Sequence, residues 1–123
     1  MLALGVALAR CGSSRVSTPN TPQPLPSDIP PIITIRATGV EPIPLHVFVG
    51  NEVTFINADT KPHSLFDDRH PIHDTCKGML KVVDLQPGQQ VKVTGLPIDA
   101  CFFHDEAQPD AKGFQGVVVM HNP

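Results

Sequence analysis

The sequence predicts an all-β protein, a Greek-key β-sandwich preceded by a disordered tether rich in Pro, Ser and Thr. Two observations carry this prediction. From Ile32 onward, apolar and polar residues alternate in short runs with a period of two, which is the side-chain period of a β-strand. Turn signals such as Gly50-Asn51 and Pro87-Gly88 separate these runs. Short strands divided by turns every 8–12 residues or so are typical of a sandwich.

The expected strands follow from this alternation. In the run 90–94, for example, Val91 and Val93 fall on a single face of the expected strand. No stretch has helical spacing over more than two turns, and only the segment 64–79 leaves room for a helix. The expected strands span residues 32–38, 45–49, 52–57, 80–84, 90–94, 98–103 and 116–121.

The chain divides into three parts. Residues 1–11 are similar to the end of a bacterial lipoprotein signal, in which Leu8, Ala9 and Cys11 fit the lipidation box and Arg10 departs from it. We therefore expect a lipid on Cys11, with an ordinary signal fragment as the alternative. Residues 12–31 have the composition of a flexible linker, and residues 32–123 form one domain.

Composition excludes several functions. The 123-residue chain has a net charge of −3, and its Lys and Arg residues are scattered, so we expect no nucleic-acid partner. The sequence lacks the Gly-x-Ser-x-Gly turn of serine hydrolases, and it lacks the His-x-His clusters that multicopper oxidation requires. We therefore predict a monomeric protein that is not an enzyme.

Three side chains stand out as metal ligands. Cys101 and His104 lie three residues apart, at the expected end of a strand and in the loop that follows it. His63 lies in another loop, just after the run 52–56. One thiolate and two imidazoles are the ligand set of a mononuclear copper site that transfers electrons.

The wider pattern resembles the cupredoxins, the plastocyanin-like blue copper proteins. The likeness covers residues 32–121 and rests on five segments, namely 47–57, Lys61-Pro-His63, 85–89, Cys101-Phe-Phe-His104 and 113–119. It implies that His63, Cys101 and His104 bind one copper ion. It also implies a protein that carries single electrons and meets a redox partner near His104. The signal-like segment 1–11 predicts that the protein is exported, to the periplasm or outside the cell.

The same resemblance leaves the axial position open. The family has a methionine in a Gly-Met-x-Gly-x-Val setting, and this chain has Phe114 in the corresponding Gly113-Phe-Gln-Gly-Val117. Copper would then be three-coordinate, or Gln108 or Gln115 would supply an oxygen ligand.

Alternatives remain open at this point. The same ligands could store or deliver copper. Cys76 could form a disulfide with Cys101, as exported proteins commonly do, and this bond would leave a metal-free interaction module. His70, His73 and Cys76 could hold zinc or a second copper, or could simply belong to an exposed loop.

Overall fold

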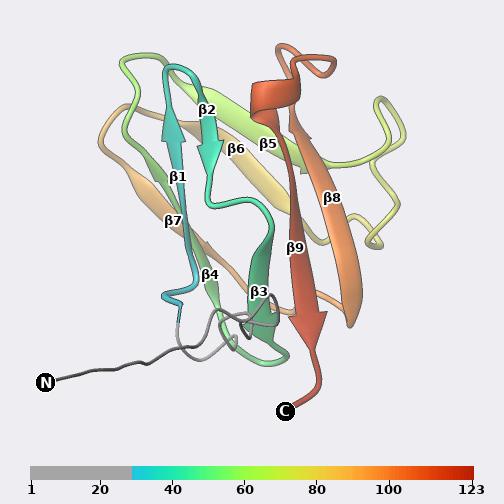
Figure 1. The fold of residues 1–123 in the computed structure, drawn as a ribbon. Helices are drawn as coiled ribbons and strands as arrows, with labels where there is room; N and C mark the ends of the chain where they lie inside the picture. Colours follow the sequence, from blue (N-terminus) through green and yellow to red (C-terminus); the bar gives the residue numbers. More distant parts are fainter. Residues whose placement is uncertain (1–28) are drawn as a thin grey trace, which may run out of the picture.

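The computed structural model describes residues 29–123, which form two packed β-sheets (Figure 1). One sheet has four strands in the order β2-β1-β4-β7, and the other has five in the order β3-β9-β8-β5-β6. The strands are β1 (Ile32–Arg36), β2 (Gly39–Glu41), β3 (Leu45–Phe48), β4 (Val53–Asn57), β5 (His63–Asp67), β6 (Lys81–Leu85), β7 (Gln90–Val93), β8 (Asp99–Asp105) and β9 (Gln115–His121). A 3₁₀ turn, η3 (Lys112–Phe114), leads into β9.

The predicted all-β sandwich is confirmed. Strand β1 pairs in parallel with β4, and β3 pairs in parallel with β9, while the other neighbours are antiparallel. The central strands of the five-stranded sheet are β9, β8 and β5, so β8 is hydrogen-bonded along both of its edges.

Two strands were not predicted. Strand β2 has only three residues, too few for a period to be visible. Strand β5 buries His63, Leu65 and Asp67, so two of its three inward positions are polar and the apolar alternation is lost. In addition, β8 runs to Asp105, which places His104 inside the strand rather than in the loop after it.

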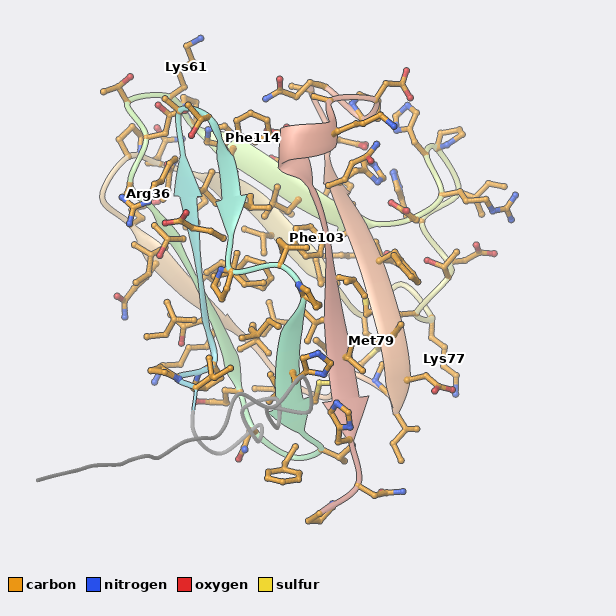
Figure 2. The ribbon with its side chains drawn as sticks, in the orientation of Figure 1. Arg36, Lys61, Lys77, Met79, Phe103 and Phe114 are labelled. Atoms are coloured by element: carbon orange, nitrogen blue, oxygen red, sulfur yellow. A yellow bond between two sulfur atoms is a disulfide. The ribbon has the colours of Figure 1, made fainter. Side chains whose placement is uncertain are left out.

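The core lies between the sheets. Phe103 of β8 is fully buried and meets Phe55 of β4 edge to face, with ring centroids 5.8 Å apart. Figure 2 shows Phe103 near the middle of the sandwich and Phe114, the last residue of η3, at its upper end. Because successive side chains of a strand point to opposite faces, the neighbouring Phe102 points outward and is 52% exposed.

The connection between β5 and β6, residues 68–80, lies beside β8 at the right of Figure 1 and is called here the β5–β6 loop. Its turn is organised by Asp67, whose Oδ2 accepts hydrogen bonds from the backbone N–H groups of Cys76 and Gly78. The N–H of Asp68 donates to the carbonyl of Phe102 over 2.8 Å, and Cys76 forms a disulfide with Cys101. The loop is therefore fastened to β8 by both a hydrogen bond and a covalent bond.

The predicted signal-like segment 1–11, including Cys11, lies outside the described residues, as does most of the predicted linker 12–31. Among residues 29–123, no helix has the length and apolar character needed to cross a membrane.

The two adjacent phenylalanines offer a matched test of the fold. We expect Phe103→Ala to lower the free energy of unfolding by about 3–5 kcal/mol, because it opens a cavity among fully buried side chains. Phe102→Ala should change it by only about 0.5 kcal/mol, since that ring is on the surface. Urea unfolding of the two variants measures the difference, and equal losses would contradict the assignment of the two faces.

Candidate metal centre

The alternation of side chains along β8 decides what each predicted ligand can reach. Cys101, Phe103 and Asp105 are buried on the inner face of the strand, whereas Phe102 and His104 belong to the outer face. His104 is nevertheless only 2% exposed, because the β5–β6 loop covers it. Two ligands three residues apart can meet if the first ends a strand and the second lies in the following loop. When both lie in the same strand, as Cys101 and His104 do, they point to opposite faces.

The structure does not bring His63, Cys101 and His104 together. The sulfur of Cys101 is bonded to that of Cys76, so the disulfide alternative is the one that the structure contains. His63 contacts Asp105, four residues further along β8 than Cys101, and four residues of strand span about 13 Å. The arrangement therefore offers no site that combines this thiol with both imidazoles.

His63 is instead locked between two carboxylates. Its Nδ1 lies 2.7 Å from Oδ2 of Asp105, and its Nε2 lies 2.8 Å from Oδ2 of Asp59. The turn that carries Asp59 is fixed by the buried Asn57, whose Nδ2 donates to the carbonyl oxygens of Lys61 and Leu85. Both ring nitrogens of His63 are therefore paired with carboxylates, and none of the His–Glu contacts that surround His104 reaches this ring.

This pairing shifts the proton equilibria of both partners. Burial alone would lower the pKa of His63, but the hydrogen bonds and charges of Asp59 and Asp105 outweigh it and raise the pKa above its ordinary value of 6.5. The hydrogen bond from His63 holds the pKa of Asp59 below its ordinary value of 3.8. The two carboxylates thus favour the protonated, imidazolium form of His63.

The residues considered for the axial position also lie at this end of the sandwich. Phe114 stacks on the His63 ring, with centroids 5.5 Å apart, and Gln108 donates from Nε2 to Asp105 over 3.2 Å. Gln115 points elsewhere and donates to the carbonyl of Pro109. A cleft of about 320 Å³ opens beside His63 and extends past Asp105 to Glu106.

A different set of side chains converges on the outer face of β8. Three imidazole nitrogens lie close to Oε1 of Glu106: Nδ1 of His70 at 2.9 Å, Nε2 of His73 at 3.1 Å and Nε2 of His104 at 3.0 Å. All four ligand atoms lie within 4.8 Å of one another. We call these residues the His–Glu cluster: His70, His73, His104 and Glu106.

The donor set of the His–Glu cluster fits a transition-metal ion. Imidazole nitrogens bind copper and zinc at about 2.0–2.1 Å, which places tetrahedral ligands roughly 3.3–3.5 Å apart. No two of the four atoms would therefore need to approach each other by more than about 1.5 Å to surround one ion. Three neutral imidazoles and one carboxylate suit Cu(II) or Zn(II) better than the oxygen-seeking Mg(II) or Ca(II).

Asp68 orients the most buried ligand. Nδ1 of His104 lies 2.7 Å from Oδ1 of Asp68, so the ring presents Nε2 to the cluster. This carboxylate–imidazole contact is the usual support of a metal-binding histidine. Without metal, burial would lower the pKa of His104, but its hydrogen bonds to Asp68 and Glu106 raise it instead. Burial would likewise raise the pKa of Glu106, yet the hydrogen bonds from His104 and His70 lower it.

Sequence reasoning identified half of this cluster as a group. His70 and His73 were recognised as a weaker metal-binding pair, but with Cys76 as their partner. Glu106 was missed, and His104 was assigned to another site. The strand period could have revealed Glu106. Residues two apart in a strand point to the same side, so Glu106, which directly follows β8, lies on the same side as His104.

No protein-family model and no curated protein sequence matches the chain. Among solved structures, a methionine-to-leucine variant of oxidised amicyanin superposes with a TM-score of 0.62 at 22% identity, covering 79% of this chain and 90% of that one. A purple cupredoxin from Nitrosopumilus maritimus gives a TM-score of 0.60 at 19% identity, covering 73% and 98%.

The fold is that of the cupredoxins. A copper-containing nitrite reductase from Thermus scotoductus also matches, with a TM-score of 0.59 at 15% identity, covering 88% of this chain but 25% of that one. At these identities the likeness shows the cupredoxin fold alone. The ligands of this chain must therefore be read from its own geometry.

The imidazolium of His63 makes stability depend on pH. In metal-free protein, we expect the free energy of unfolding to fall as the pH rises from about 6.5 through the raised pKa of His63. In this range the folded state binds more protons than the unfolded chain, so raising the pH removes the stabilisation. At the acid end, the contribution of Asp59 is lost as the pH falls below 3.8 through its lowered pKa.

Urea unfolding between about pH 6 and pH 9, with a chelator present, measures this dependence. We expect His63→Gln to make the slope shallower, since glutamine keeps hydrogen-bonding groups but does not titrate. A part of the slope should remain, because the pKa of His104 is also raised. A slope as steep as that of the parent protein would contradict the assigned role of His63.

Proposed function

We propose that this protein binds one copper ion outside the cytoplasm at the His–Glu cluster, and that it stores the ion or delivers it. The observation that carries the proposal is the convergence of three imidazole nitrogens and one carboxylate oxygen within 4.8 Å. Copper is favoured over other divalent ions because Cu(II) binds nitrogen and oxygen donors most tightly in the first-row series. The amicyanin and nitrite reductase that share the cupredoxin fold are also described as copper proteins.

Each residue of the cluster has a distinct part in this proposal. His104 would be the anchoring ligand, because it is buried and Asp68 fixes its orientation. His70 is 44% exposed in its side chain, so it offers the side from which an ion enters or leaves. Glu106 would supply the anionic donor that offsets part of the charge of the ion.

The site suits exchange of the ion better than fast electron transfer. Two of its four ligands come from the irregular β5–β6 loop, so ligand positions can change with the oxidation state of copper. Its donor set also contains no thiolate, which is the ligand that characterises blue copper sites. Binding and release, rather than catalysis, is therefore the role that we assign.

Electron transfer is the second candidate function. It is favoured by the cupredoxin fold, which amicyanin shares in structures described as oxidised and as Cu(I). A redox partner would dock near His104, where Phe102 and Ile72 are exposed apolar side chains. A copper-loaded protein with fast, reversible voltammetry would support this function. Slow electron exchange together with ready transfer of copper to a chelator would support storage or delivery.

The disulfide supports the proposed location. Disulfides form and persist in exported proteins and are rare in the cytoplasm, where thiols are kept reduced. The Cys76–Cys101 bond therefore favours a periplasmic or extracellular protein. A lipid on Cys11, which would tether the domain to a membrane, stays a prediction.

Replacing the anchoring ligand tests the proposal. We expect the parent protein to bind one equivalent of Cu(II), with an electron spin resonance spectrum that shows coupling to several imidazole nitrogens. His104→Ala should weaken binding by about 100-fold or more, because it removes the most buried ligand. The matched control is His46→Ala, since His46 contacts His121 rather than the cluster. Equal affinities of both variants and the parent would contradict the proposal.

A further inference from the structure

We infer that the Cys76–Cys101 disulfide positions the ligands of the His–Glu cluster, so that metal binding and disulfide formation stabilise each other. This inference rests on the proposed metal site. The disulfide joins the two segments that supply the ligands, with Cys76 three residues after His73 and Cys101 three residues before His104. It is thus the covalent link between the two halves of the site.

The rest of the β5–β6 loop has few other connections to β8. Pairing of β5 with β8 ends at Asp67 opposite Phe103, and the backbone bond from Asp68 to Phe102 follows directly. Apart from the contacts of His70 and His73 with Glu106 in the His–Glu cluster, the loop beyond Asp68 is held mainly by bonds within itself and to Asp67. The disulfide, with Cα atoms 5.2 Å apart, closes the far side of the loop onto β8.

This closure has a direct consequence for the ligands. His70 and His73 lie between the two points at which the loop is attached, Asp68 and Cys76. With the disulfide, Cys76 is attached directly to β8, which keeps the ligands of this segment at a high effective concentration near His104. Without it, Cys76 is held only through Asp67 of β5, and the segment can move relative to β8. Groups that orient metal ligands typically change metal affinity by about 10- to 100-fold.

The coupling must be reciprocal. When the two thiols form the disulfide, they give two electrons and two protons to an oxidant of the disulfide class, which becomes a dithiol. If the disulfide form binds metal more tightly than the dithiol form, metal must disfavour reduction by the same factor. A tenfold ratio of affinities corresponds to a reduction potential lower by about 30 mV.

The first experiment compares zinc affinities, with zinc used because it does not oxidise thiols. We expect the folded double variant Cys76→Ala/Cys101→Ala to bind Zn(II) about tenfold or more weakly than the oxidised parent. Alanine is chosen so that no free thiol can act as a new ligand. A cooperatively unfolding variant that binds within about twofold of the parent would overturn the inference and leave the proposed function intact. An oxidised parent that shows no binding dependent on His104 would instead overturn both.

The second experiment needs no cysteine variant and decides the matter if the double variant does not fold. The oxidised parent is equilibrated in glutathione redox buffers with and without a fixed free Zn(II) concentration, and the fraction of disulfide is measured by thiol alkylation. We expect zinc to move the midpoint toward more reducing buffers, and we expect no such shift in His104→Ala. A midpoint that does not move, or that moves toward the dithiol, would overturn the inference.

Discussion

The alternation of side chains along β8 is the constraint on which the arrangement depends. Because this strand is hydrogen-bonded to both β5 and β9, its pleat is fixed and neighbouring side chains must leave on opposite faces. Phe103 and Asp105 therefore point into the sandwich, and His104 points out of it. The core and the candidate metal site are therefore separated by one residue of sequence and by the thickness of the sheet.

A buried histidine on an outer face needs a cover, and the β5–β6 loop supplies it. Asp67, at the last position of β5, is fully buried and uses its carboxylate to hold two backbone N–H groups of the loop. Asp68 then bonds to His104 on the other face. Asp67 and Asp68, at the end of β5, thus form hydrogen bonds on opposite faces of the sheet. Together they fix the path of the β5–β6 loop over the candidate metal site.

The fold could be predicted from the sequence where the apolar alternation is complete, as in β4 and β7, and where turns are marked by glycine. It could not be predicted for β5, since His63 and Asp67 fill inward positions that usually hold apolar residues. The candidate site was harder for a related reason. A Cys-x-x-His spacing does not show where the strand ends. If the strand ends between the two residues they can share a site, and if it continues past the histidine they lie on opposite faces.

His63 and His104 show why similar surroundings lead to different chemistry. Each ring lies between two carboxylates, and each has a raised pKa for that reason. Phe114 stacks on the His63 ring and adds no donor atom for a metal ion, so the carboxylates favour a proton on this ring. Around His104, two further imidazoles approach the same carboxylate oxygen, and a single cation can replace the protons on all three rings. The neighbours therefore make one histidine a closed ion pair and the other a candidate metal ligand.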